Sequence, residues 1–309
     1  MERELSPYLR LAEATYRMTV GARALGDDQL LIVDPRHYQH EIALKQAILA
    51  SDRRYYAQAL AGSEAAQWEV LALVLQSLAR NYPDQFTLRQ AGDDWDWHNR
   101  PSGEQRSFRY GKSDLGCLPI DWAGQQVQED LLLMSGDADT GFPLIAGQLC
   151  FANRWCLDDK IGLSFLAIHD PVPGFADQVG HSSNLLLDRL KQDRPVWRLN
   201  WSVLATGELN RATRFGHELD GDREGVTAQN AGERCFFRTE RQTLSRLPRS
   251  GAILFTVHTY LAPIATLAEN RVWRDQMIGV LRTTPADMIR YKGMAIFSAP
   301  LLAYLEALQ

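Results

Sequence analysis

The sequence predicts an α+β fold: a central, mainly antiparallel sheet with helices contributed by the N- and C-terminal parts of the chain. Residues 1–90 and 263–309 carry apolar side chains mostly at helical spacing, whereas residues 115–262 hold short apolar runs separated by Gly, Asp and Pro clusters. The connections between these runs lack repeated helical crossovers, which favours antiparallel pairing. We therefore expect residues 1–309 to form a single domain with its sheet in the middle of the sequence.

The N-terminal part predicts two helices, over residues 41–49 and 63–80. The second helix carries one apolar face, formed by Trp68, Leu71, Leu75 and Leu78. Asn81-Tyr82-Pro83 ends it, because proline cannot continue a helix. Residues 90–113 are polar and rich in turn formers, so they predict a loop, with residues 95–98 packed on its surface.

Six short apolar runs predict the strands of the sheet. They are residues 130–134, 144–151, 162–168, 196–204, 235–243 and 252–260. A helix over residues 177–192 is expected between the third and fourth strands. Helical spacing returns after residue 261, and Thr284-Pro285 predicts a helix start with Thr284 as the cap and Pro285 at the first helical position.

Composition limits the functions that the chain can have. An apolar content of 45% in 309 residues is ample for a core, and the net charge of −5 argues against the basic patch of a nucleic-acid-binding protein. No stretch approaches the roughly 18 apolar residues that span a bilayer. The charged start lacks the apolar core of a signal peptide, and the four cysteines form no C-x-x-C pair, so we expect reduced thiols in a cytoplasmic protein.

His169 is the most informative single residue. It follows the apolar run 161–168 and precedes Asp170, Pro171 and Pro173, and each proline fixes the backbone around it. A rigidly held histidine beside apolar surface suits a metal or cofactor ligand. An ordinary hydrogen-bonded histidine at a strand end is the alternative. Motifs for dinucleotides, P-loop nucleotides, α/β-hydrolases and zincins are absent from the sequence.

Polar side chains interrupt the predicted strands, first at Glu129 and Asp130. Successive side chains of a strand point to opposite faces, so at most one of these carboxylates shares a given pocket. A solvated strand start explains the pair equally well.

A second interruption lies on the strand 196–204. Arg198 and Asn200 share one side, and the other side carries Trp197, Leu199 and Trp201. A guanidinium beside wide aromatic side chains can hold a planar cofactor that bears carboxylates. An exposed face of an amphipathic strand would show the same pattern.

The third interruption lies on the strand 235–243. Alternation places Arg238, Glu240 and Gln242 on one side and Arg241 on the other. Flanked by Arg238 and Arg241, Glu240 is expected to stay ionised, because nearby positive charge favours a carboxylate. A salt-bridge network that fixes the strand to a helix is the structural alternative.

The order of these motifs resembles the haem-dependent oxidative N-demethylase family. The resemblance is carried by KIGLSFLAIHDPVPGF, RPVWRLNW and RTERQTLSRLPRSGAILFTVHTYLAPI, and earlier by YRMTVGARAL, IVDPRHY, EVLALVLQSLARNYPDQF, VQEDLLLM and LIAGQLCFANRWCLDDK. It covers roughly residues 15 to 300 in the same order.

The resemblance implies a PAS-like fold that binds haem b and uses oxygen to remove a methyl group from a small methylated amine such as dimethylamine, with formaldehyde as product. Electrons would come from NADPH through partner reductase subunits. His169 is the candidate iron ligand, which agrees with the suitability of imidazole for iron. Arg198, Arg238 and Arg241 are candidates to hold the propionates, and Glu240 or Glu129 to receive the cationic amine, because a buried ammonium needs a carboxylate.

One departure concerns His258, which stands where the family typically has arginine. It is a rival haem ligand to His169. The alternative function is a haem-binding sensor or regulatory module without catalytic turnover. The absorption spectrum of the purified protein distinguishes these two haem-binding functions from a scaffold without haem.

Overall fold

The computed structural model describes residues 5–112, 115–213 and 221–308, and it confirms the mixed α+β class. Its main sheet is antiparallel and has the strand order β1-β8-β9-β10-β6-β7-β2. The strands are β1 (Arg23–Ala24), β2 (Ala57–Ala59), β6 (Asp130–Met134), β7 (Leu144–Gln148), β8 (Val196–Leu204), β9 (Phe236–Arg246) and β10 (Ile253–Pro263). Five of the six predicted strands are therefore present.

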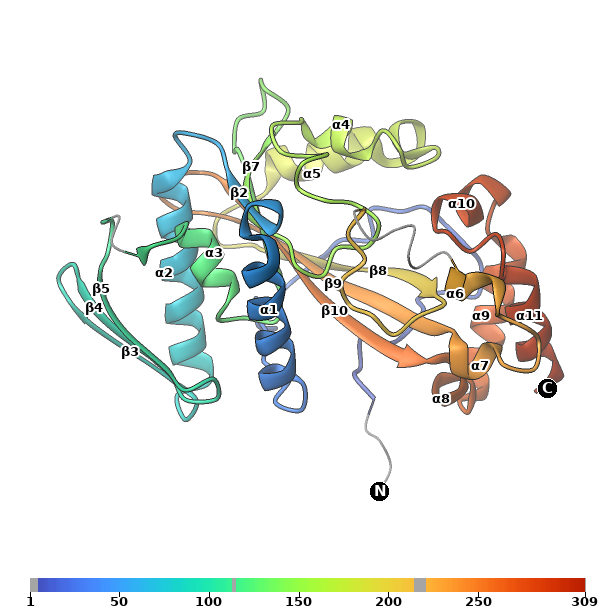
Figure 1. The fold of residues 1–309 in the computed structure, drawn as a ribbon. Coiled ribbons are helices and arrows are strands. Elements are labelled where there is room, and N and C mark those ends of the chain that lie inside the picture. The colour runs from blue at the N-terminus through green and yellow to red at the C-terminus, as the bar shows by residue number, and fades with distance from the viewer. Residues whose placement is uncertain (1–4, 113–114, 214–220, 309) are drawn as a thin grey trace.

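Helices from both ends of the chain pack against this sheet, as predicted. Figure 1 shows the N-terminal helices at one end of the long strands β8–β10, the C-terminal helices at the other end, and α4 and α5 above the sheet. The N-terminal helices are α1 (Tyr38–Tyr56), α2 (Glu64–Asn81) and α3 (Pro119–Gly124). Those at the C-terminal end are α6 (Gly221–Glu224), α7 (Ala231–Arg234), α8 (Ile264–Ala268), α9 (Arg271–Thr283), α10 (Ala286–Tyr291) and α11 (Ser298–Ala307).

The prediction of a loop over residues 90–113 is wrong. This segment forms most of a three-stranded antiparallel sheet, which consists of β3 (Phe86–Ala91), β4 (Asp94–Asn99) and β5 (Glu104–Arg109). Along β4 exposed and buried residues alternate, and Trp95 and Trp97 are buried rather than packed on a surface. Trp97 stacks on Phe86 and donates a hydrogen bond to Gln126 Oε1. Polar residues on the outward positions concealed an alternation that is typical of a half-buried strand.

The strand predicted for residues 162–168 is also wrong. After a turn, the chain forms the short helix α4 (Phe165–His169), begun by Ser164, whose hydroxyl accepts the Ala167 amide at 3.4 Å. The helix predicted over 177–192 is present as a π-helical turn, η2 (Ala176–Gly180), followed by α5 (His181–Arg189).

The prediction of Thr284 as the helix cap is wrong by one residue. Its hydroxyl donates back to the carbonyl of Val280 in α9, and Pro285 occupies the cap position before α10. Proline still suits this boundary, because its fixed φ and missing N–H fit a helix start.

Three clusters of buried apolar side chains hold the layers together. One joins α2, the three-stranded sheet and the near end of the main sheet, and a second joins α7–α11 to the far end. The third lies between the main sheet and the α4–α5 layer. Cys150 and Cys235 are fully buried in these clusters, as expected for small core residues. Among the described residues, no helix is both long and apolar enough to cross a membrane.

Candidate functional site

The main sheet divides the candidate site residues between its two faces. The register aligns Asn200 with Glu240, and Leu199 with Arg241 and His258. Because alternate residues of a strand point to opposite faces, one face carries Arg198, Asn200, Arg238, Glu240 and Gln242, and we call it the open face. The other carries Glu129, Arg241 and His258, and we call it the closed face.

The strand β8 is incompletely covered along most of its length, on both of its faces. The first six residues of this strand, Val196–Trp201, are all half-buried, whereas its last three are buried. β1 pairs with only two residues of β8, so most of this strand forms the edge of the sheet. Polar side chains on this stretch of sheet are therefore within reach of a ligand.

His169 belongs to the layer above the open face. Its neighbours Phe165 and Ile168 pack in the same apolar cluster as Val196, Leu244 and Phe255, which point from that face of the sheet. Burial lowers the pKa of His169, and the positive charge of Arg198 lowers it further. His169 and Arg198 consequently face the same space.

The imidazole of His169 is held in one orientation. Nδ1 lies 2.8 Å from the carbonyl oxygen of Phe165, and the ring stacks on Phe175 with centroids 4.3 Å apart and 12° between the planes. A carbonyl oxygen can only accept, so Nδ1 carries the proton and Nε2 presents its lone pair. A neutral histidine that donates Nδ1–H to a backbone carbonyl is the usual state of a metal-ligating imidazole.

Glu240 is the carboxylate that β9 contributes to the open face, and its oxygens already have partners. Oε1 accepts Arg238 Nε at 3.2 Å, and Oε2 accepts the side-chain amides of Asn200 and Gln242 at 3.2 and 3.0 Å. Arg241 does not flank it, contrary to the prediction, because this side chain points to the closed face. Of these two arginines, only Arg238 forms an ion pair with Glu240.

Arg198 retains binding capacity. Its Nη1 donates to Gln242 Oε1 at 3.3 Å, while its Nε is buried without a hydrogen-bond partner. An unpaired buried donor is costly, so this guanidinium fits an acceptor supplied by a ligand. Burial lowers the pKa of Arg198, and Glu240 opposes that shift.

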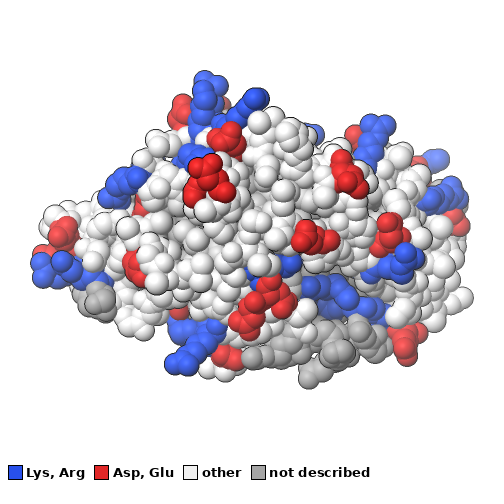
Figure 2. All heavy atoms as spheres, turned by 90° about the horizontal axis from the view of Figure 1, so that it is seen from above, with Lys and Arg blue, Asp and Glu red and all other residues white. Residues whose placement is uncertain are grey.

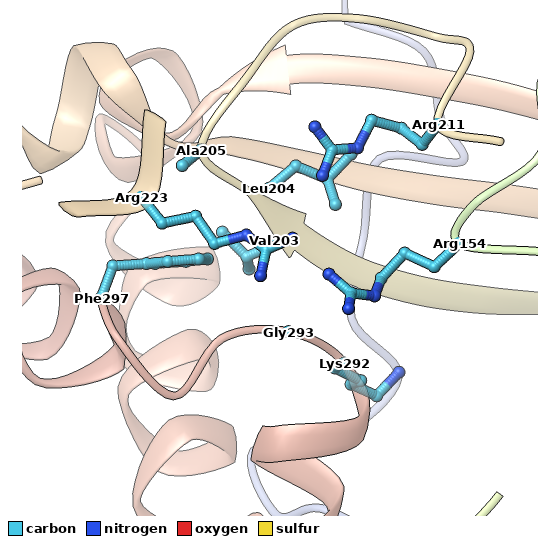
Figure 3. Close-up of a pocket in the computed structure, with 9 residues that line it drawn as sticks. All are labelled: Arg154, Val203, Leu204, Ala205, Arg211, Arg223, Lys292, Gly293 and Phe297. Carbon is cyan, nitrogen blue, oxygen red and sulfur yellow. The ribbon is translucent and has the colours of Figure 1, made fainter. Parts of the chain in front are cut away.

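Basic residues that the sequence analysis missed converge at the far end of β8. Figure 3 shows Arg154, Arg211, Arg223 and Lys292 around a cleft floored by residues 203–205. Seen from the side of α4 and α5, acidic and basic side chains are interspersed over most of the surface, and basic ones gather beside residues that are not described (Figure 2). We call the space between Arg154, Arg211, Arg223 and Lys292 the cationic cleft. Four separate segments contribute its basic residues, so no local spacing could reveal it.

A groove of about 430 Å³ borders the turn that follows His169. Residues 16–19, Pro173 and Gly174, and the start of α10 line it. Asp287 is its acidic residue, and burial together with the charge of Asp287 raises the pKa of Tyr16 in the same groove.

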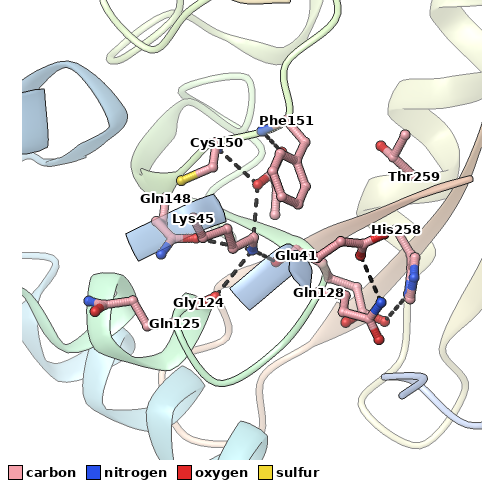
Figure 4. A network of polar contacts seen from close by, with 12 residues as sticks. Glu41, Lys45, Gly124, Gln125, Gln128, Gln148, Cys150, Phe151, His258 and Thr259 are labelled. Atoms are coloured by element: carbon pink, nitrogen blue, oxygen red, sulfur yellow. Dashed lines mark hydrogen bonds and ion pairs between the residues drawn. The ribbon is translucent and has the colours of Figure 1, made fainter. Parts of the chain in front are cut away.

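The closed face contains an enclosed polar network, in which Glu129 Oε2 and Arg241 Nε have no hydrogen-bond partner among the described residues. His258 Nδ1 lies 3.0 Å from Glu129 Oε1, which also accepts the Ile32 amide at 2.9 Å, and the His258 ring stacks on Tyr260 (Figure 4 shows the surrounding network). Burial alone would raise the pKa of Glu129, but its contacts with His258 outweigh burial and lower it. Glu129 and His258 are at most 1% exposed.

Arg241 completes the closed face. Its guanidinium donates to the carbonyls of Gln29 and Leu30 and lies over the rings of Tyr8 and Trp197. Arg241, Glu129 and His258 are therefore separated from His169 by the sheet itself. As predicted, Glu129 and its neighbour Asp130 point to opposite faces: Asp130 accepts the amides of Cys150 and Phe151.

The donor set of the open face fits a metal that a macrocycle already holds. Within the described ranges, no three His, Cys, Asp or Glu side chains lie together as a site for a bare metal ion. A single oriented imidazole is what haem iron requires from the protein, and a buried guanidinium with an unused donor suits a carboxylate of the same cofactor. The residues present are compatible with haem.

Comparison with protein families finds one match across most of the chain. Residues 21–302 match the family model described as haem-dependent oxidative N-demethylase, alpha subunit-like.

Proposed function

Since the chain belongs to the haem-dependent oxidative N-demethylase, alpha subunit-like family, we propose that it binds haem b and demethylates a small methylated amine such as dimethylamine. Formaldehyde is the second product, and the electrons come from NADPH through a partner reductase. The words "alpha subunit-like" in the family description agree with the need for such a partner.

The observation that carries the proposal is the geometry of His169. Its Nδ1–H is bound by the Phe165 carbonyl, its ring is fixed against Phe175, and its neutral form is favoured by burial. Together these leave Nε2 as an oriented, unprotonated ligand for iron.

Haem supplies the oxygen chemistry when bound, and the chain supplies binding, orientation and electrostatics. His169 holds the iron through Nε2. Arg198 offers its unused Nε–H to a carboxylate of the cofactor at the sheet surface.

The groove beside Pro173 and Gly174 borders the turn after His169, and it carries one acidic residue, Asp287, and one basic residue, Arg17. Glu240, which is 9% exposed and lies on the open face, is the carboxylate that receives the amine, because Glu129 is 0% exposed on the closed face. Arg238, Asn200 and Gln242 hold both oxygens of Glu240 in place.

An absorption spectrum of the purified protein tests the iron ligand. We expect wild-type protein incubated with haem to show a Soret band, His169→Ala to lose the histidine-ligated spectrum, and His181→Ala, at an exposed position of α5, to keep it. A wild-type protein that stays colourless after incubation contradicts the proposal.

Formaldehyde release from dimethylamine, driven by NADPH and a surrogate reductase, tests the activity. We expect release from the haem-loaded wild type and none from His169→Ala. A haem-loaded protein that releases no formaldehyde from any small methylated amine, and whose spectrum none of them changes, favours the sensor over the enzyme.

A further inference from the structure

We infer that the groove lined by Tyr16, Pro173 and Asp287 binds a small N-methylated ammonium ion, at a site separate from Glu240. An alkylamine, like the side chain of lysine, is protonated at pH 7 and is therefore a cation. The inference rests on the proposed function for the identity of this amine. It assigns a ligand to a hollow that the residues of the open face do not line.

The groove has room for a small molecule. Its volume of about 430 Å³ lies in the range of pockets that bind such ligands. Three segments that are far apart in the sequence line it, within residues 16–19, 173–178 and 283–288. An ion with a few non-hydrogen atoms can therefore enter without displacing a side chain.

Hydrogen bonds hold the walls of the groove in place. The Tyr16 amide donates to the Thr283 hydroxyl at 2.9 Å, and this hydroxyl donates to the Gly279 carbonyl of α9 at 2.7 Å. In the wall next to η2, the Gln178 amide donates to the Gly174 carbonyl at 3.0 Å. Gly174 has a φ of 70°, which favours glycine at this turn. Walls that are fixed in advance reduce the entropy lost on binding.

Asp287 gives the groove a carboxylate for a cation. It is exposed and forms no ion pair within the described ranges, and its Oδ1 accepts the Met288 amide at 2.8 Å. Arg17 also lines the groove, but its guanidinium lies 3.4 Å from the Glu13 carboxylate. Glu13 therefore balances the charge of Arg17, whereas the charge of Asp287 remains for a ligand.

Tyr16 brings an aromatic ring to the same carboxylate. Burial and the charge of Asp287 raise the pKa of Tyr16, so its phenol lies near Asp287. Aromatic rings attract ammonium ions and are the side chains that recognise methylated ones. The pair supplies both the charge and the ring that such a ligand needs.

Apolar side chains complete the lining and suit the methyl groups of the ligand. They are Met18, Pro173, Pro285 and Met288, and Met288 is 3% exposed. Thioether and ring carbon atoms gain dispersion energy against methyl groups, which a plain ammonium ion does not offer. The lining therefore favours a methylated ammonium ion over ammonium.

The groove adjoins the segment that carries the candidate iron ligand. Pro173 lies in the turn directly after His169, where the Val172 amide donates to the His169 carbonyl at 2.9 Å. An amine held in the groove is thus close to the layer above the open face.

Methyl NMR of the full chain, labelled with ¹³C at its methionine methyl groups, tests the inference. We expect dimethylammonium to shift the signals of Met18 and Met288 saturably, with a Kd on the order of 1 mM, because so small a ligand binds weakly. The signals of Met134 and Met277, which lie in the core, should not move. Ammonium and 2-propanol, a neutral molecule of similar size, should each bind at least about fivefold more weakly.

Two carboxylates give a matched pair of variants. Asp287→Asn should weaken the binding of dimethylammonium about fivefold, because it removes the charge and keeps the shape. Asp177→Asn is the control, since Asp177 is an exposed acid of η2 that does not line the groove, and it should change the Kd less than about twofold.

The outcomes separate this inference from the proposed function. If dimethylammonium shifts neither Met18 nor Met288, or if both variants weaken its binding equally, the groove is not an amine site, and formaldehyde release by the haem-loaded protein still tests the function. If the two signals shift as expected but the haem-loaded protein releases no formaldehyde, the groove binds the cation and the proposed function is wrong. The measurement on wild type needs no variant, so a variant that fails to fold does not prevent the test.

Discussion

The two faces of the main sheet carry the same kinds of residue and use them differently. On the closed face, Glu129 binds His258, and Arg241 binds backbone carbonyls and lies over aromatic rings. Core helices cover this face. On the open face, Arg198 keeps an unused donor, and His169, in the layer above, has its Nδ1 bound to the Phe165 carbonyl.

The difference teaches that coverage, more than residue type, separates a structural network from a binding site. Most buried polar groups are paired, and the covered face pairs most of its charges internally, although Glu129 Oε2 and Arg241 Nε are, like Arg198 Nε, buried without a hydrogen-bond partner in the described part of the chain. A partly covered face can leave that pairing to a ligand. Removing a residue from the closed face should therefore cost stability, whereas removing one from the open face should cost haem affinity.

The largest stability effect should come from Lys45, a buried cation at the start of β6 that lies beside Asp130. Its Nζ is fully buried and donates to the carbonyls of Gly124 and Glu129, with Asp130 at 3.6 Å. Lys45→Met should lower the free energy of unfolding in urea by about 3–5 kcal/mol, because it leaves these acceptors buried without their cation. Lys112→Met, at an exposed position, is the control. A loss below about 1 kcal/mol would show that these contacts contribute little.

Replacing each of the two histidines by alanine gives the most direct contrast between the faces. His258→Ala should lower the free energy of unfolding by about 2–3 kcal/mol, because it leaves Glu129 buried without its side-chain partner, and should keep the Soret band. His169→Ala should lose the ligated spectrum and change stability by less than about 1 kcal/mol. If His258→Ala instead removes the Soret band, the iron ligand lies on the closed face.

Acid should weaken the segment that borders the closed face. Burial alone would raise the pKa of Asp34, but hydrogen bonds from Arg36 and His37 outweigh it and lower the pKa to about 2 from 3.8. A lowered folded-state pKa stabilises above about pH 4, and this contribution, about 2 kcal/mol, is lost as the pH falls toward 2. Asp34→Asn should flatten this part of the curve of unfolding free energy against pH. An unchanged slope would contradict the assignment.

The smallest effect follows from Lys292, which binds the Trp201 carbonyl at the edge strand β8. Burial lowers the pKa of Lys292 to about 8, partly opposed by Glu240. Because the folded protein releases this proton at a lower pH than the unfolded chain does, the free energy of unfolding should rise by up to about 1 kcal/mol per pH unit above pH 8. Urea unfolding from pH 7 to 10 measures this. Lys292→Met should remove the dependence, and a variant with the wild-type slope would assign it to another group.

Most of the sheet was predictable from local patterns. The apolar runs at β6, β8, β9 and β10 are continuous enough to give strands, and alternation alone placed Glu129 and Asp130, and Glu240 and Arg241, on opposite faces. β4 was missed because its outward positions are polar and its buried tryptophans were interpreted one by one. The run 162–168 was assigned to a strand because a short apolar segment does not distinguish a strand from a helix.

The sequence by itself determined the fold class, the family and the candidate ligand His169, because these depend on order and spacing along the chain. Only the tertiary structure decided that His169 and Arg198 face one space, that His258 lies across the sheet from them, and that Arg154 and Lys292 meet at the end of β8. The physical reason is that a strand specifies which side chains share a face, whereas the helices packed on that face decide whether it is filled or left for a ligand.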